Sequence, residues 1–198
     1  MIISFKIRRL LAVSSLALFT LFCGCVERIY KQNDFRLYSK NFRLPDGALL
    51  RTDGVYVLDS IYAGGAKRKA TEHRFYTFFE GGQVNLTLDM DHLIHTNKDY
   101  EESVKRHLQS WQVSPQKTLF EGYFYTEGNR IVIERASVPR NLLVYTYGKL
   151  AEDRLEVVKQ AINGRGRIQD KYFESDYRET YRFLPLSKTA FTSVRPGW

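Results

Sequence analysis

The tightest group of side chains that could do chemistry lies in the segment 89–95, DMDHLIH. It contains two carboxylates, Asp89 and Asp91, and two imidazoles, His92 and His95. Oxygen and imidazole groups of this kind bind Zn²⁺ or a similar ion. No third ligand is fixed by spacing, and the two histidines do not form a known helical ligand pair. The preferred interpretation is therefore a polar loop after a strand, and a metal-assisted enzyme is the alternative.

Other catalytic patterns are missing from the sequence. No Ser lies in a Gly-x-Ser-x-Gly turn, from which many hydrolases present their nucleophile. Gly164 and Gly166 form a Gly-x-Gly pair, but the rest of a phosphate-binding pattern does not follow. The carboxylates lie largely on predicted strands, so their spacing defines no acid–base pair. The sequence therefore favours a binding or structural protein over an enzyme, and it predicts no bound cofactor.

Both cysteines of the chain, Cys23 and Cys25, lie at the end of an apolar run, residues 10–22. Three basic residues precede this run and a polar stretch follows the cysteines. A basic start, an apolar run and a small residue before a cleavage point are typical of a secretory signal. The run is shorter than the roughly 20 residues that cross a bilayer. A disulfide between the two cysteines would close a strained loop, so the pair needs another explanation.

The residues Phe22-Cys23-Gly24-Cys25 resemble the signal of bacterial lipoproteins, in which Gly or Ala precedes an invariant Cys. The resemblance implies that residues 1–24 are a lipoprotein signal peptide and that Cys25 begins the mature chain. Cys25 would then carry a thioether-linked diacylglycerol and an N-acyl chain such as palmitate. Such lipids anchor a protein to the envelope membrane without spanning it. Val26, in place of Asp, implies the outer membrane.

The net charge of the chain is positive. It is +8 for all residues and +5 without residues 1–24, from 27 Lys and Arg against 22 Asp and Glu. These charges are spread along the sequence, which is typical of a solvated surface rather than of a nucleic-acid-binding one. We therefore expect no nucleic-acid partner. Weak attraction to an anionic membrane is the other interpretation of this charge.

Strand patterns dominate the chain after residues 25–48, which we interpret as a tether and lead-in segment. Turn residues at 80–83, 127–129 and 151–153 join strands into hairpins, and a loop is expected at 63–72. Eight strands are predicted, at residues 51–62, 73–79, 83–88, 118–126, 130–136, 142–150, 154–162 and 177–186. Eight antiparallel strands lose their unpaired edges when they close. We therefore predict a mainly β domain at 49–198, an up-and-down barrel, with a two-sheet β-sandwich as the alternative.

One stretch between the third and fourth predicted strands has helical periodicity. Tyr100, Val104, Leu108 and Trp111 recur at helical spacing within residues 97–112. This pattern predicts an inserted amphipathic helix of about four turns. We expect its apolar stripe to pack on the sheet, and docking of a partner is the alternative.

Gly54-Val55-Tyr56, on the first predicted strand, resembles the Gly-x-Trp motif with which lipocalins open, with Tyr in place of Trp. The strand order is also similar to that of lipocalin-like (calycin) barrels. The resemblance implies a cup for a small apolar or amphipathic ligand. Aromatic residues suit such a cup because they offer apolar area and, in Tyr, a hydroxyl. The candidates to line it are Tyr56, Phe75, Tyr123, Tyr125, Tyr145, Tyr147 and Tyr181.

These patterns leave two main hypotheses for the function. The first is a membrane-anchored envelope lipoprotein whose barrel binds a small lipophilic ligand. The second is a structural lipoprotein that docks an envelope protein complex and binds no small molecule. In the second case the aromatic residues fill an ordinary core and also form a dimer interface.

Overall fold

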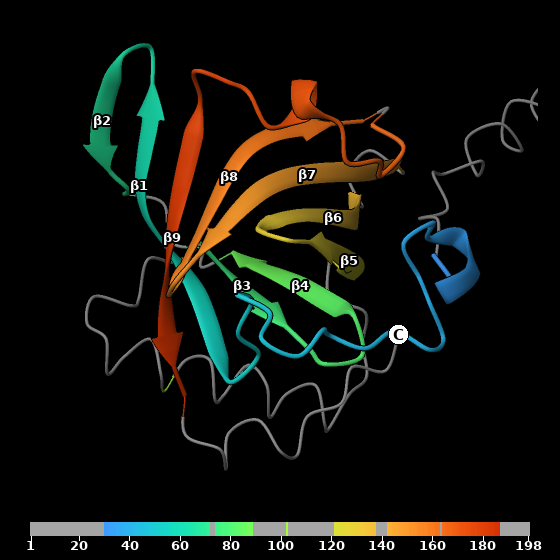
Figure 1. Ribbon diagram of the computed structural model, residues 1–198. Coiled ribbons are helices and arrows are strands. Elements are labelled where there is room, and N and C mark those ends of the chain that lie inside the picture. Colours follow the sequence, from blue (N-terminus) through green and yellow to red (C-terminus); the bar gives the residue numbers. More distant parts are fainter. Residues whose placement is uncertain are drawn as a thin grey trace, which may run out of the picture.

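The computed structural model describes residues 30–71, 74–88, 102, 121–137, 142–162 and 164–186. Figure 1 shows them as an antiparallel sheet that curves around on itself. The strands are β1 (Gly54–Ala63), β2 (Ala66–Lys69), β3 (Arg74–Phe78), β4 (Gln83–Leu88), β5 (Glu121–Glu127), β6 (Arg130–Ser137), β7 (Leu142–Ala151), β8 (Arg154–Ala161) and β9 (Arg178–Pro185). Two short 3₁₀ turns, η1 (Gln32–Asp34) and η3 (Asp170–Tyr172), accompany them.

Eight of these strands close into a barrel. β1 and β3 to β9 pair with their neighbours in sequence order. β9 then pairs back onto β1, from Gly54 opposite Pro185 to Tyr62 opposite Arg178. The predicted eight-stranded antiparallel barrel is therefore confirmed. The sandwich alternative is excluded, because a closed sheet does not divide into two layers.

β2 is a ninth strand outside the barrel, and the sequence prediction of a loop there was wrong. Gly64 and Gly65 adopt φ angles of +59° and +82°, which form the tight turn that folds the chain back onto the end of β1. Three of the four residues of β2 are Lys or Arg, and all four are exposed. Charges on an edge strand prevent pairing with another chain, and they also hid the strand from a search for apolar alternation.

The two ends of the barrel differ in the length of their connections. Short turns at one end, which we call the short-turn end, span residues 79–82, 128–129 and 152–153. Longer connections leave the other end, which we call the long-connection end, at residues 70–73, 89–120, 138–141 and 162–177. Ligands of small barrels bind in the mouth of the barrel, so the long-connection end is the place to look for a site.

Aromatic and branched side chains fill the barrel interior. Tyr56, Tyr76, Phe78, Phe124 and Tyr181 are fully buried in one cluster. Edge-to-face contacts join them, with ring centroids 5.6 Å apart for Tyr56–Phe78 and 5.2 Å apart for Phe78–Phe124. Such pairs contribute about 1 kcal/mol beyond the area that they bury. Because the described residues contain no cysteine, this packing is what stabilises the barrel.

The chain just before β1 covers the short-turn end. Phe42 packs edge-on against Phe124, with ring centroids 5.1 Å apart. The guanidinium group of Arg51 pairs with Asp53 at 2.7 Å and with Asp153, in the β7–β8 turn, at 2.9 Å. This end of the barrel is therefore closed by the chain itself.

Residues 30–44, which we call the strap, run along the outside of the barrel (Figure 1, blue). Phe35, Leu37 and Tyr38 pack on the outer face of β5, β6 and β7, and Phe42 and Leu44 then pack against the interior cluster at the short-turn end. Phe35 is buried on this outer face. The Leu37 N–H donates to the carboxylate of Glu134 at 2.7 Å, and the Tyr145 hydroxyl donates to the same carboxylate at 2.7 Å. Charge-assisted hydrogen bonds to a buried carboxylate are among the stronger ones in proteins. Glu134 thus clamps the strap onto the barrel.

Residues 164–174, in the β8–β9 connection, form a second cover beside the strap. Tyr172 stacks on Tyr147 with ring centroids 4.5 Å apart, and Phe173 meets the same ring edge-on at 5.7 Å. The Tyr147 hydroxyl donates to the Gly164 carbonyl at 2.8 Å. Strands β5, β6 and β7 are therefore apolar on both faces for two reasons. Their inner faces form the core of the barrel, and their outer faces are buried by the strap and this cover.

The predicted helix at 97–112 lies outside the described residues, apart from Glu102, which has helical geometry. Within the described part of the chain, no helix combines the length and the apolar character needed to cross a bilayer.

Gly54 lets β1 and β9 approach each other where the barrel closes. A Cβ atom at this position would lie 2.2 Å from the Leu184 carbonyl oxygen and 2.5 Å from the Phe183 ring. Only glycine fits such a close approach of backbone. We therefore predict that Gly54→Ala destabilises the fold by about 2 kcal/mol or more, since overpacking alone costs about 1–3 kcal/mol. Chemical denaturation followed by circular dichroism measures this loss.

Gly81→Ala is the matched control for that prediction. Its added Cβ would meet only the end of the flexible Gln83 side chain, at 2.5 Å, which can rotate away. We expect its stability to stay within about 0.5–1 kcal/mol of the wild type. Equal losses for the two variants would show that the closure seam tolerates a methyl group.

Candidate functional site

The structure does not bring the seven predicted ligand-binding residues together. Tyr56 and Tyr181 lie inside the barrel. Phe75 is buried but alternates with Tyr76, so it lies on the outer face of β3. Tyr125 is 41% exposed on the outside of β5. The other three, Tyr123, Tyr145 and Tyr147, are buried on the outer face beneath the strap and the 164–174 cover.

Sequence parity could not separate the inner from the outer aromatic residues. Tyr123 packs on Phe35 and Tyr38 of the strap, with ring centroids 5.1 Å away in both cases. Its neighbour Phe124 points into the core. Both faces of β5 are therefore aromatic. The signal that could have resolved them is the apolar alternation of Phe35 and Leu37, within the segment interpreted as a tether.

Other predicted site residues lie outside the described residues. They are Cys25, the predicted lipid-attachment site, and Asp89, Asp91, His92 and His95, the candidate metal ligands. Among the residues that are described, no three His, Cys, Asp or Glu side chains group into a possible metal site.

A layer of polar side chains crosses the barrel interior at its long-connection end. Most members share their strand parity with core residues, as Glu179 does with Tyr181 and Arg135 does with Ile133. Gln160 comes after a β-bulge in the β7–β8 pairing and lies opposite Thr146. We call this set the polar layer, and it consists of Arg74, Tyr76, Arg135, Thr146, Gln160, Tyr177, Glu179 and Tyr181, of which Gln160 and Tyr177 are exposed at the rim. The sequence reasoning missed it because it searched the core parity for aromatic residues only. The signal that could have revealed it is Glu179, which lies on the same face of the last strand as the apolar residues Tyr181 and Phe183.

Glu179 is the centre of the polar layer, with a side chain only 3% exposed. Its carboxylate pairs with the Arg74 guanidinium group at 2.6 Å. It also accepts hydrogen bonds from the hydroxyls of Tyr181, at 2.8 Å, and Tyr177. A buried carboxylate needs such partners, because an unpaired buried charge costs several kcal/mol. This network fixes the positions of three side chains around one anion.

Two buried hydroxyls in the same layer, those of Tyr76 and Thr146, lack hydrogen-bond partners among the described residues. The Tyr76 hydroxyl lies beside Thr146 and near the charge of Arg135. Neither hydroxyl has a partner with good hydrogen-bond geometry among the described residues. Arg135 donates to the Gln160 side-chain oxygen at 3.3 Å. Each unsatisfied buried polar group costs about 1–3 kcal/mol, so a polar group that reaches this layer gains hydrogen bonds that the protein does not already make.

The charges of the polar layer suit recognition rather than catalysis. Burial raises the pKa of Tyr76 and, more strongly, that of Tyr181, and burial together with the Glu179 hydrogen bond raises the pKa of Tyr177 to about 12. These phenols are therefore neutral donors at pH 7. Burial acts to lower the pKa of Arg74, but Tyr181 and Glu179 outweigh it, and the net shift is upward. The charges of Arg74, Arg135 and Glu179 all act on the buried Tyr76 hydroxyl, and guanidinium groups of this kind favour a polar or acidic ligand group.

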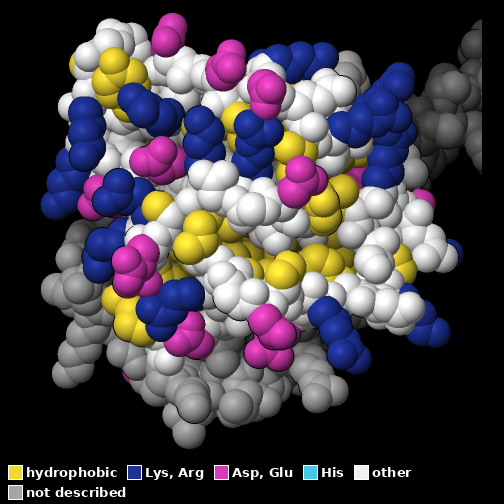
Figure 2. Space-filling view, in the orientation of Figure 1, with side chains coloured by type: hydrophobic (Ala, Val, Ile, Leu, Met, Phe, Trp, Pro, Cys, Tyr) yellow, Lys and Arg dark blue, Asp and Glu magenta, His cyan; other side chains and the backbone are white. Residues whose placement is uncertain are grey.

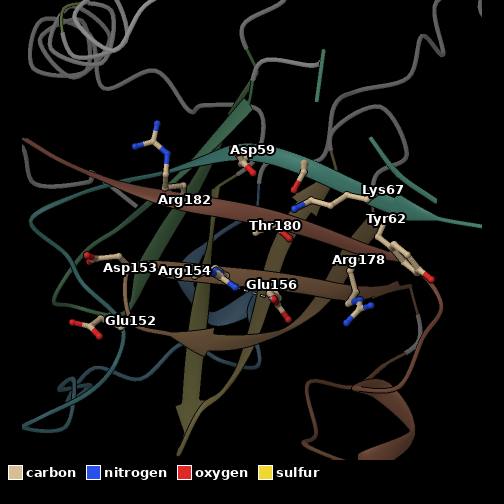
Figure 3. A pocket seen from close by; sticks show the side chains of 11 residues that line it. Asp59, Tyr62, Lys67, Glu152, Asp153, Arg154, Glu156, Arg178, Thr180 and Arg182 are labelled. Atoms are coloured by element: carbon tan, nitrogen blue, oxygen red, sulfur yellow. Dashed lines mark ion pairs between the residues drawn. The ribbon is translucent and has the colours of Figure 1, made fainter. Parts of the chain in front are cut away.

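A second feature is a groove of about 480 Å³ on the outer wall, lined by residues of β1, β2, β8, β9 and the β7–β8 turn (Figure 3). Arg154 and Glu156 in it lie 3.8 Å apart, and the Arg178 guanidinium group is 4.9 Å from the centre of the Tyr62 ring. Its charged residues balance, with Asp59, Glu152, Asp153 and Glu156 against Lys67, Arg154, Arg178 and Arg182. None of the seven predicted residues lines it. The groove therefore favours neither positively nor negatively charged ligands, in contrast to the polar layer.

Comparison with known proteins adds no family to this geometry. We found no family model, no curated protein and no solved structure that matches the chain. The site has to be interpreted from its own residues.

The Arg74–Glu179 pair gives a test of the polar layer. We predict that Glu179→Gln lowers the free energy of unfolding by about 3 kcal/mol, because it leaves the Arg74 charge buried without its partner. Glu156→Gln, on the outer face of the adjacent strand, removes a carboxylate from a more exposed pair and should cost less than about 1 kcal/mol. Urea denaturation measures both. A second change, Arg74→Met, should recover part of the loss in the Glu179→Gln protein, and no recovery would contradict the assigned pairing.

Proposed function

We propose that the chain is a lipid-anchored envelope protein whose barrel binds a small lipophilic ligand at its long-connection end. The polar end of the ligand contacts Arg74, Arg135 and Tyr76. The observation that carries the proposal is the polar layer, in which the largely buried guanidinium groups of Arg74 and Arg135 and the buried carboxylate of Glu179 lie within an otherwise apolar barrel. A protein that only needed a stable core would gain by replacing such a layer with apolar side chains of similar volume.

The difference between the two ends of the barrel supports entry of the ligand at the long-connection end. Phe42 and the Arg51 ion pairs close the short-turn end. Toward the other end, where Thr146 lies opposite Gln160 near the end of β8, the hydroxyls of Tyr76 and Thr146 have no hydrogen-bond partner among the described residues. A ligand that enters from the long-connection end meets polar groups first and aromatic rings beneath them. This order favours an amphipathic molecule with a compact polar or acidic group.

Anchoring is the second part of the proposal, and it rests on the resemblance of residues 22–25 to a lipoprotein signal. We predict that Cys25→Ala abolishes incorporation of a fatty-acid label in a bacterial host, because the acceptor thiol is lost. Cys23→Ala is the matched control, and it should be labelled as the wild type is. Metabolic labelling with an alkyne fatty acid, followed by mass spectrometry of the N-terminal peptide, distinguishes the two. Loss of label in both variants, or in neither, would contradict the assignment of Cys25.

Ligand binding is tested by extraction of the purified protein. We predict that residues 26–198, exported to a bacterial periplasm, retain a stoichiometric lipophilic molecule that mass spectrometry of an organic extract detects. The Arg135→Gln protein should retain about one tenth of the wild-type amount of ligand, or less, because a charge-assisted hydrogen bond contributes about 1.5–3 kcal/mol to binding. Arg154→Gln, on the outer wall, should retain as much as the wild type. Circular dichroism confirms that all three proteins are folded.

Docking of an envelope complex is the second candidate function. The observation that favours it is the interior packing, in which five large aromatic rings are fully buried by the protein's own side chains. An empty extract from a folded protein would support this candidate. Equal occupancy in the Arg135→Gln protein would place the ligand away from the polar layer.

A further inference from the structure

The exposed side chains of the strap are mostly cationic. Lys31, Arg36, Lys40 and Arg43 are all exposed, and Asp34 is the acidic residue among residues 30–44. The Asp34 carboxylate accepts the Lys31 backbone N–H at 2.8 Å, so it caps the η1 turn. The strap therefore presents a positive surface to its surroundings.

The start of the 164–174 cover continues this positive surface, whereas its later part carries Asp170 and Glu174 beside Lys171. Gly166 lies against the strap, since a Cβ atom there would be 3.0 Å from a methyl carbon of Leu37. The residues on each side of it, Arg165 and Arg167, are exposed. Figure 2 shows Lys and Arg side chains at the upper right edge of the molecule, and others on the left near the β1–β2 hairpin. We call the strap together with residues 165–167 the basic face. The outer groove, in contrast, carries balanced charge.

The chain length between the strap and Cys25 is short. Tyr30 begins the described residues and packs against Phe35, with ring centroids 5.9 Å apart. Five residues of extended chain reach at most about 18 Å. A lipid on Cys25 would thus hold the first residue of the strap within that distance of a bilayer, about twice the Debye length at physiological salt.

From these two observations we infer that the basic face docks on anionic lipid headgroups, so that the protein lies on the membrane in one orientation. This inference rests on the proposed acylation of Cys25. Each Lys or Arg at an anionic surface strengthens the contact roughly five-fold. The β1–β2 hairpin lies on the opposite side of the barrel from the strap (Figure 1). In the inferred orientation it would therefore be directed away from the bilayer.

The test uses the mature lipoprotein in vesicles, with one added thiol for a fluorescent label. Cys23 is removed with the signal and Cys25 is blocked by its lipid, so an introduced cysteine is the single free thiol. Ser39→Cys places the label on the basic face, and Ala66→Cys places it on β2, where the residue is also small and exposed. Headgroup-attached spin labels in the vesicles quench a fluorophore that lies close to the surface. The vesicles are phosphatidylcholine with or without phosphatidylglycerol.

We expect several-fold stronger quenching at position 39 than at position 66 in phosphatidylglycerol vesicles. The difference should shrink at high salt and in pure phosphatidylcholine. The triple variant Arg36→Gln/Lys40→Gln/Arg43→Gln should weaken the docked state roughly 100-fold and remove the difference. The matched triple variant Lys67→Gln/Arg68→Gln/Lys69→Gln removes the same charge from the hairpin and should leave the difference intact.

The outcomes separate this inference from the anchoring proposal. If Cys25 is not acylated and the protein fails to enter vesicles, the anchoring proposal fails and the inference fails with it. If the acylated protein enters vesicles but both labels are quenched equally, the basic face does not dock, although the anchor exists. Equal quenching of label 39 in neutral and anionic vesicles would also overturn docking, because the tether alone would then explain it.

Discussion

The pairing of β9 with β1 is the constraint on which the rest of the structure depends. Once these strands meet, side chains on the inner parity of all eight strands are enclosed, whatever their chemistry. This closure buries the aromatic cluster that stabilises the fold. It also buries Arg74 and Glu179, which would be an ordinary surface ion pair on an open sheet. Their mutual contact at 2.6 Å compensates for desolvation that an apolar layer would never incur.

The elements that the sequence predicted well are those determined by local chemistry. Gly82 and Gly128 adopt φ angles of +85° and +58°, so the turns around them could be located from the glycines alone. Alternation then gave each strand between the turns, and the count of eight led to closure. β2 could not be found in this way, since nothing in a run of charged residues indicates an edge strand. It forms because the Gly64-Gly65 turn directs the chain back along β1.

The site was harder to predict than the fold, for a physical reason. Alternation tells which side chains share a face, but it does not tell which face is inside. On β5 and β7 both faces are buried, one by the core and one by the covers, so Tyr123 and Tyr147 have the same pattern as true core residues. The polar layer shows the converse. Glu179 has the parity of Tyr181 and Phe183, and a charged residue at a core position is the more informative departure.

In the proposed lipoprotein, the strap would link the packing of the barrel to its placement at a membrane. If residues 26–53 were a free tether, an acylated Cys25 could hold the barrel anywhere within roughly 100 Å of the bilayer. Because Glu134 clamps Leu37 and Phe35 is buried against Tyr123, only the few residues before Tyr30 are left to act as tether. The exposed Lys and Arg side chains of the strap are thereby held next to the barrel wall. A buried carboxylate on the outer wall would thus determine which side of the protein meets the membrane.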